Sequence, residues 1–131
     1  MNEVMEFLKK CGTYYLATVD EQGGARVRPF GTIDLFDGHL TIQSGRSKDV
    51  SKQIMANPKI EICAFDGTQW LRVCAVAKED PRIGAQQHML DQYPSLQGMY
   101  KAGDGNTIIF ALVSGTATFS SFTAAPRTIT L

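Results

Sequence analysis

The sequence predicts a mainly β protein: an antiparallel β-barrel with helices on its flanks. Short runs of β-branched and aromatic residues recur along the chain, a pattern typical of strands. Most of these runs are separated by tight turns, so neighbouring strands are expected to be antiparallel. A sheet built in this way avoids exposed edges by closing into a barrel. The 131 residues fit one domain, which we expect to span 1–131.

The first third of the chain predicts one helix and three strands. Gly12 is placed to end a short N-terminal helix whose apolar residues share one face. Asp37-Gly38 is the strongest hairpin signal in the chain, because this pair favours the turn that joins two antiparallel strands. Pro29 interrupts the strand that precedes this turn and indicates a sheet edge, a bulge or a kink that faces a ligand. The expected strands span residues 13–19, 26–36 and 39–43.

The rest of the chain predicts two further helices and four strands. Ser47 is a suitable N-cap for the first of these helices, and Pro58 stops it. Asp80-Pro81 is a typical start for the second. Ser114-Gly115 is expected to turn a final hairpin. The helices are expected at residues 48–57 and 83–93, with a helical turn at 95–100, and the strands at 60–65, 69–78, 107–113 and 116–122.

The charge balance excludes some classes of partner. Thirteen basic residues match thirteen acidic ones, whereas nucleic acids and anionic membranes select for excess positive charge. The N-terminus does not have the pattern of a signal peptide, and no apolar run approaches the length of a membrane span. We therefore expect a cytoplasmic protein with no nucleic-acid or membrane partner. The tail at 123–131 has no packing pattern and is expected to be loose.

The cysteines and histidines do not predict a site. Cys11, Cys63 and Cys74 contain no Cys-x-x-Cys pair, and we expect buried thiols in a reducing compartment. His39 and His88 lack the spacing of metal ligands, so no metal site is predicted. Neither a P-loop nor a dinucleotide-binding Gly-x-Gly-x-x-Gly motif is present.

The segment before the helix at 48–57 is the most informative part of the chain. A helix N-terminus offers unpaired N–H groups and a partial positive charge, which together attract phosphate. Arg46, Ser47 and Lys48 add two charges and a hydroxyl at this point, immediately after a strand that contains Ile42 and Gln43. The segment therefore predicts a phosphate site. The alternative is an ordinary capped helix with solvated basic residues.

Two further stretches are candidates for contact with a ligand. Arg26 and Arg28 share one face of a strand. In the functional interpretation, Arg28 reaches a phosphate or a ring carbonyl, and Pro29, Phe30 and Gly31 present backbone to a flat ligand. The alternative is a solvent-facing strand edge with two arginines. Trp70 is the single tryptophan, and it is expected either to stack near an aromatic ligand or to pack in the core or an interface.

Taken in order, these pieces resemble the pyridoxamine 5′-phosphate oxidase-like family of flavin-binding split barrels, and more closely its small nitroimidazole-reductase-like branch. The resemblance covers roughly residues 1–122, and the ordered set of segments carries it rather than any one motif. The segments are Tyr14-Tyr15-Leu16-Ala17-Thr18-Val19-Asp20, Val27-Arg28-Pro29-Phe30, Asp37-Gly38-His39-Leu40, Ser47-Lys48, Asn57-Pro58-Lys59-Ile60, Trp70-Leu71-Arg72 and Met89-Leu90-Asp91-Gln92-Tyr93-Pro94.

The resemblance implies a six-stranded antiparallel split β-barrel that forms a homodimer, with flavin mononucleotide (FMN) at the interface. It implies that Ser47 and Lys48, with Arg46 beside them, hold the phosphate of FMN, although many relatives have an arginine at the position of Ser47. It places the strand with Arg28, together with Ile42 and Gln43, along the flavin. The chain has no C-terminal Arg/His cluster for pyridoxal phosphate, so vitamin B6 oxidation is not expected.

Three functions remain open at this point. The first is an FMN-dependent oxidoreductase that transfers hydride or electrons from a reduced nicotinamide to a small-molecule acceptor. In such an enzyme the flavin carries the chemistry and the protein orients it, so no catalytic acid or base is named. The second is a non-enzymatic flavin or haem carrier or sensor. The third is an interaction domain without a ligand, because fold alone does not fix function.

Overall fold

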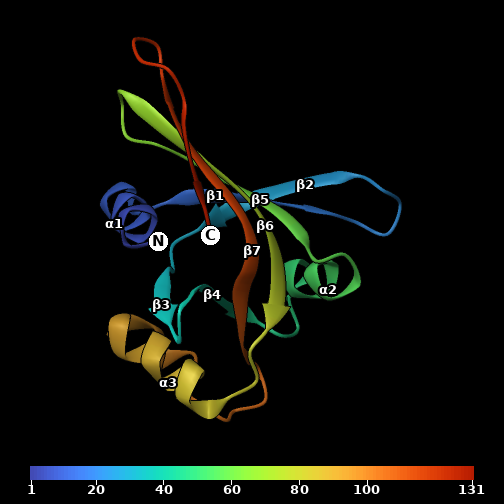
Figure 1. Ribbon diagram of the computed structural model, residues 1–131. Coiled ribbons are helices and arrows are strands. Elements are labelled where there is room, and N and C mark those ends of the chain that lie inside the picture. Colours follow the sequence, from blue (N-terminus) through green and yellow to red (C-terminus); the bar gives the residue numbers. More distant parts are fainter.

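Eight strands form a single antiparallel sheet, accompanied by three α-helices (Figure 1). The computed structural model describes all residues 1–131. The strands follow the order β2-β1-β5-β6-β7-β4-β3, with β8 paired to β7. This path does not return to its first strand, so the sheet is not closed. The strands are β1 (Tyr14–Val19), β2 (Ala25–Phe30), β3 (Asp34–Phe36), β4 (His39–Gly45), β5 (Lys59–Phe65), β6 (Gln69–Glu79), β7 (Thr107–Ser121) and β8 (Arg127–Thr130).

The predicted fold class, a mainly β antiparallel split barrel, is confirmed, but the expected closure of the sheet is wrong and the strand count is eight rather than six. One reason is that the expected strand at 26–36 is two strands, since residues 31–33 leave the sheet between β2 and β3. The predicted hairpin at Asp37-Gly38 is confirmed, because it joins β3 to β4 and both residues have positive φ angles, 51° and 79°. The edge position predicted from Pro29 is also confirmed, because β2 ends the path of the sheet.

The predicted final hairpin at Ser114-Gly115 is wrong. These residues lie inside the continuous strand β7, which follows β6 along its whole length. The pairing shifts register between Val76 and Ala77, where Val113 of β7 has no partner in β6. Gly115, whose φ is 148°, lies two residues away and pairs with Ala75. The glycine that resembles a turn signal is therefore a point of close contact beside a β-bulge, where the absence of a side chain lets the backbone of β6 come close.

The tail is not loose. Residues Arg127–Thr130 form β8, which pairs with β7 from Thr116 to Phe119. Arg127 forms an ion pair with Glu3 and lies over the ring of Phe119, and Ile129 packs against the core. The chain reverses between β7 and β8 at the upper tip of the molecule in Figure 1. A strand of four residues that follows a turn is too short to show a periodic pattern. The sequence therefore did not predict β8.

The helices cover separate parts of the sheet (Figure 1). They are α1 (Asn2–Cys11), α2 (Asp49–Ala56) and α3 (Ile83–Gln92), with the 3₁₀-helix η1 (Pro94–Gly98) after α3. As predicted, Val4, Phe7 and Leu8 bury one face of α1, and Gly12 ends it with a φ of 77°. None of the helices is long and apolar enough to cross a membrane.

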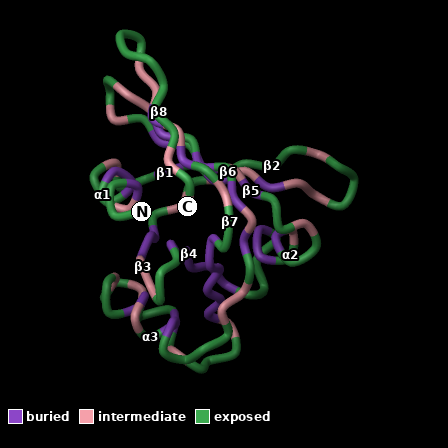
Figure 2. Tube along the Cα trace, in the orientation of Figure 1, coloured by how far each residue is buried: buried purple, intermediate pink, exposed green.

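The core lies inside the curl of the sheet (Figure 2) and is made mainly of aliphatic residues from the strands and α1. The prediction of buried cysteines is wrong, since Cys63 and Cys74 are exposed and Cys11 is half-buried. In β5 and β6 the strand alternation places these two cysteines on the outer face, opposite the core residues Ile62 and Val73.

Candidate functional site

The candidate site is an open cavity of about 530 Å³ between β2, β4, the start of α2 and the η1 segment. It brings together six of the residues expected to contact the cofactor: Arg28, Pro29, Phe30, Gly31, Gln43 and Lys48. Its other lining residues are Thr32, Ser44, Val50, Tyr93, Ser95, Leu96, Met99 and Tyr100. The lining thus combines two cations, one amide and several hydroxyls with aromatic and apolar side chains, as a phosphate-bearing aromatic ligand requires.

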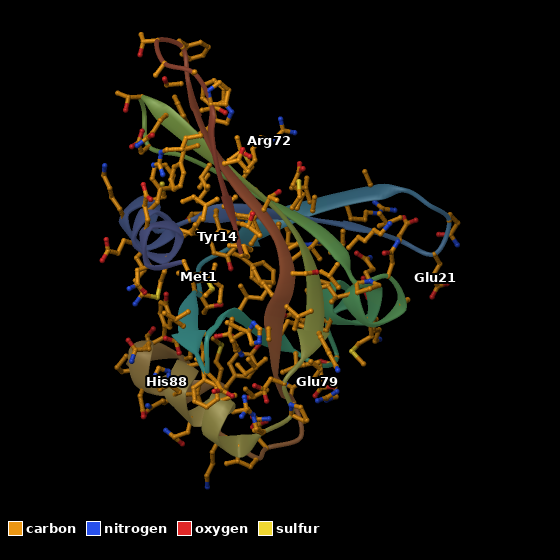
Figure 3. The ribbon with its side chains drawn as sticks, in the orientation of Figure 1. Met1, Tyr14, Glu21, Arg72, Glu79 and His88 are labelled. Atoms are coloured by element: carbon orange, nitrogen blue, oxygen red, sulfur yellow. The ribbon has the colours of Figure 1, made fainter.

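The wall between β2 and β3 is held by hydrogen bonds rather than by the sheet. The Tyr14 hydroxyl, buried in the interior (Figure 3), donates to the carbonyl of Thr32 at 2.5 Å. The Thr32 hydroxyl oxygen in turn accepts from the amide of Gln43 at 3.0 Å. The Tyr93 hydroxyl accepts from the amide of Ile33 and donates to its carbonyl, both at 3.0 Å. These bonds fix the segment that the sheet leaves unpaired.

Arg28 is the charged group most firmly built into the site. Its Nη1 donates to the carbonyl of Leu16 at 3.1 Å and to the hydroxyl of Thr18 at 2.8 Å, and its Nη2 donates to Oε1 of Gln53 at 2.9 Å. All three acceptors are neutral, and no carboxylate lies within ion-pair distance. Burial, together with nearby Arg26, lowers the pKa of Arg28 from its ordinary value, while Asp49 opposes that shift. The guanidinium therefore carries an uncompensated positive charge in the cavity wall.

Every other arginine of the chain has a carboxylate partner. This contrast separates arginines that serve the structure from the one that faces the cavity. The pairs are Arg26 with Asp20, Arg46 with Glu79, Arg72 with Glu61, Arg82 with Asp80 and Asp37, and Arg127 with Glu3.

Lys48 and the first turn of α2 form the second positive element. The helix begins at Asp49, and Lys48 is its N-cap residue, with no side-chain capping bond. The carbonyl of Lys48 accepts from the amides of Ser51 and Lys52, whereas the amides of Asp49 and Val50 have no acceptor in the protein. The Lys48 ammonium forms no ion pair and lines the cavity, so this end of the helix can receive an anion.

The predicted N-cap at Ser47 is therefore wrong by one residue. The Ser47 amide donates to Oδ1 of Asn106 at 3.4 Å, and the Arg46 amide donates to the carbonyl of Asn106 at 2.6 Å. The loop before β7 thus binds the backbone of residues 46 and 47. Ser47 does not line the cavity.

Three further residues expected at the site lie elsewhere in this chain. Arg46 forms an ion pair with Glu79 at the end of β6 (Figure 3), and the hydrogen bond from this pairing raises the pKa of Arg46. Ile42 is fully buried in the core. Trp70 packs against Phe122, with 5.1 Å between ring centroids, and does not line the cavity.

The α3–η1 connection forms the opposite wall of the cavity, which sequence reasoning missed. Tyr93, Leu96, Met99 and Tyr100 line the cavity from this side, and burial raises the pKa of Tyr93. The local signal for this segment is Tyr93, which comes directly before Pro94 at the end of the expected helix. The partners of Arg28 were missed for a similar reason, because Thr18 and Gln53 lie on different elements, 35 residues apart.

No group of three or more His, Cys, Asp or Glu side chains in the structure is arranged to hold a metal ion. His88 Nδ1 lies 2.5 Å from a side-chain oxygen of Asp34 and forms a hydrogen bond with it, and Asp34 is buried between β3 and α3. This pair connects α3 to the sheet.

The open antiparallel barrel and the cationic cavity at its edge define a small, mainly β protein with a cation-lined cavity. The comparisons place the chain more narrowly. Residues 1–90 match the family model for pyridoxamine 5′-phosphate oxidase, and the chain belongs to this family. No curated protein sequence gives a significant match.

Solved structures agree with this assignment. The chain superposes on a NimC/NimA family protein from Clostridium acetobutylicum with a TM-score of 0.95 and 37% identity, covering 100% of this chain and 92% of that one. A pyridoxamine 5′-phosphate oxidase-related, FMN-binding protein from Nostoc punctiforme gives 0.62 and 13%, covering 96% and 90%. A haem storage protein from Vibrio cholerae gives 0.66 and 20%, covering 85% and 87%. The last two show a shared fold.

Proposed function

We propose that this protein binds FMN in the cavity between β2, β4 and η1, and that it is an FMN-dependent oxidoreductase. The observation that carries the proposal is Arg28, a partly buried cation whose protein partners are all neutral. Lys48 and the free amides of the first turn of α2 add further attraction for a phosphate. The FMN-binding relative from Nostoc punctiforme supports the choice of ligand.

The roles of the residues follow from their places in the lining. Arg28 and Lys48 would hold the phosphate, and Pro29 to Gly31 would present the edge of β2 to the ring. Phe30, Leu96 and Met99 would exclude water from the apolar part of the ligand. FMN, when bound, would supply the redox chemistry, accepting hydride from a reduced nicotinamide and passing electrons to a small-molecule acceptor. We place this activity in the cytoplasm, where reduced nicotinamides are available.

We further propose a homodimer, with the flavin at its interface. One outer face of the sheet exposes Val27, Tyr15 and Phe65, at 68%, 51% and 58%. The register places these residues along a diagonal across three strands. Val27 pairs with Ala17, two residues after Tyr15, and Tyr15 pairs with Cys63, two residues before Phe65. Exposed large apolar side chains that gather on one face are typical of an interface. Sedimentation equilibrium tests it, and the mass of one chain, 14.4 kDa, would contradict it.

The alternative function is a non-enzymatic flavin or haem carrier or sensor. It is supported by the haem storage protein from Vibrio cholerae, which has the same fold. An absorbance spectrum of the purified protein separates the possibilities, since a Soret band indicates haem and flavin bands indicate FMN. Bound flavin without turnover of reduced nicotinamide, with nitro or quinone acceptors present, would favour the carrier.

The phosphate site is tested with Lys48→Ala and two ligands. We expect the variant to weaken FMN binding by about 1–3 kcal/mol, the range for a charge-assisted hydrogen bond. Riboflavin has no phosphate, so its affinity should hardly change. Arg46→Ala is the matched control, because Arg46 lies two residues away but is paired with Glu79 outside the cavity. Equal losses for both ligands in Lys48→Ala would refute the assignment.

A further inference from the structure

The contacts of Arg28 form a closed network with two other side chains. Gln53 Oε1 accepts from both Nη2 of Arg28, at 2.9 Å, and the hydroxyl of Thr18, at 2.5 Å. The Thr18 hydroxyl oxygen also accepts from Nη1 of Arg28, at 2.8 Å, so each of the three side chains contacts the other two. Thr18 is only 2% exposed and lies on β1, while Gln53 reaches the network from the second turn of α2. The guanidinium is thereby fixed between two elements of the fold.

This network orients the arginine without neutralising it. The contacts occupy Nη1 fully and Nη2 in part, so Nε and one Nη2 hydrogen have no acceptor in the protein. Arg28 lies between two cavities, because it lines both the site of about 530 Å³ and a neighbouring cavity of about 840 Å³ that contains Gln53. A carboxylate at position 53 would give Arg28 the kind of partner that every other arginine has.

We propose that Gln53, supported by Thr18, is a positioning residue that makes the site selective for phosphate monoesters. Its neutral oxygen holds Arg28 in place while leaving the positive charge available to the ligand. The inference rests on the proposed function, because FMN is the phosphate monoester that we expect this cavity to bind. It adds that selection for FMN over riboflavin depends on an uncharged residue at position 53.

The test is Gln53→Glu, which keeps the size of the side chain and replaces the neutral acceptor with a carboxylate beside Nη2 of Arg28. We expect FMN affinity to fall by about tenfold or more, as Arg28 gains an internal counter-ion. Riboflavin affinity should change little, and the melting temperature of the ligand-free variant should equal or exceed that of the wild type. Gln22→Glu is the control, because it adds the same charge at an exposed turn without contact to Arg28.

A purely structural role for Gln53 predicts a different pattern. It would lower the melting temperature of Gln53→Glu, or would change FMN and riboflavin affinity equally, and either result overturns the proposal. Gln53→Met provides a second test, because it keeps the length of the side chain and removes the acceptor. We expect it to lower the FMN-to-riboflavin affinity ratio as well, by less than Gln53→Glu, and an unchanged ratio in both variants refutes the inference.

The two proposals fail in different ways. If the wild type binds neither FMN nor riboflavin, the proposed function is wrong. Inorganic phosphate then still tests the network, since it should raise the melting temperature of the wild type and not that of Gln53→Glu. Equal stabilisation of both proteins by phosphate overturns the role assigned to Gln53.

Discussion

Replacing Gly115 with alanine tests the long β6–β7 pairing at its closest point. A Cβ built on Gly115 would lie 2.2 Å from the carbonyl oxygen of Cys74 and 2.7 Å from Cα of Ala75. Both are backbone atoms, so no side-chain rotation relieves the clash. The φ of 148° is also unfavourable for alanine. Overpacking and strained backbone each cost about 1–3 kcal/mol, so we expect Gly115→Ala to lower the free energy of unfolding by about 2–5 kcal/mol.

Urea unfolding followed by circular dichroism measures this change. At this chain length the expected loss also lowers the melting temperature by about 10 °C. Gly98→Ala is the matched control, because a Cβ there meets no atom within 4 Å and its φ is not positive. We expect that control to stay within about 0.5 kcal/mol of the wild type. A similarly small effect for Gly115→Ala would show that β6 and β7 do not approach each other as described.

Two further predictions concern acid stability and assembly. Hydrogen bonds from the backbone amides of Thr107, Lys101 and Asn106 lower the pKa of Asp104 from 3.8 to about 2, so its contribution to stability is present above pH 3.8 and is lost as the pH falls towards 2. Asp104→Asn should therefore give a flatter dependence of the unfolding free energy on pH in this range, and an unchanged slope would contradict the assignment. In the proposed dimer, Tyr15→Glu should place a charge in the apolar face and shift the sedimentation mass towards 14.4 kDa, whereas a dimer as tight as the wild type would exclude that face.

The sequence predicted most of the fold because local patterns determine most of its elements. Buried and exposed residues alternate along the strands, as with Ile60 and Ile62 in β5. The Asp37-Gly38 pair favours the tight turn of a β-hairpin over other local structures. The errors occurred where a local signal has two structural meanings. A glycine between two β-rich runs indicates a turn or a close approach of two strands with equal force. Gly115 is the second case, because β6 pairs with both runs and its backbone comes close at this residue.

Burial was less predictable than strand position. Cysteine is usually buried, but the face on which it lies depends on register, and register depends on the partner strand. Cys63 and Cys74 occupy outward positions of β5 and β6, so their chemical preference for burial did not decide their exposure. If the proposed dimer covers this face, both cysteines are buried in the assembly.

The candidate site could be predicted only as two separate stretches. The strand with Arg28 and the helix start with Lys48 do lie on one cavity, whereas the wall from Tyr93 to Tyr100 comes from a segment with no site-like signal. Sequence spacing also could not distinguish Arg46 from Lys48, since both flank Ser47. The structure separates them through Glu79, a residue 33 positions from Arg46 that gives it a partner.

Charge pairing therefore provides a criterion for function that spacing does not. An arginine with a carboxylate partner is electrostatically satisfied and contributes to the fold, as Arg46 and Arg127 do. An arginine held by neutral groups costs free energy in the absence of an anion, because burial disfavours its charged form. Such an arrangement becomes favourable when a ligand supplies the negative charge. In this chain the criterion selects Arg28 alone among the arginines, and Arg28 lies in the wall of the cavity to which the family resemblance also points.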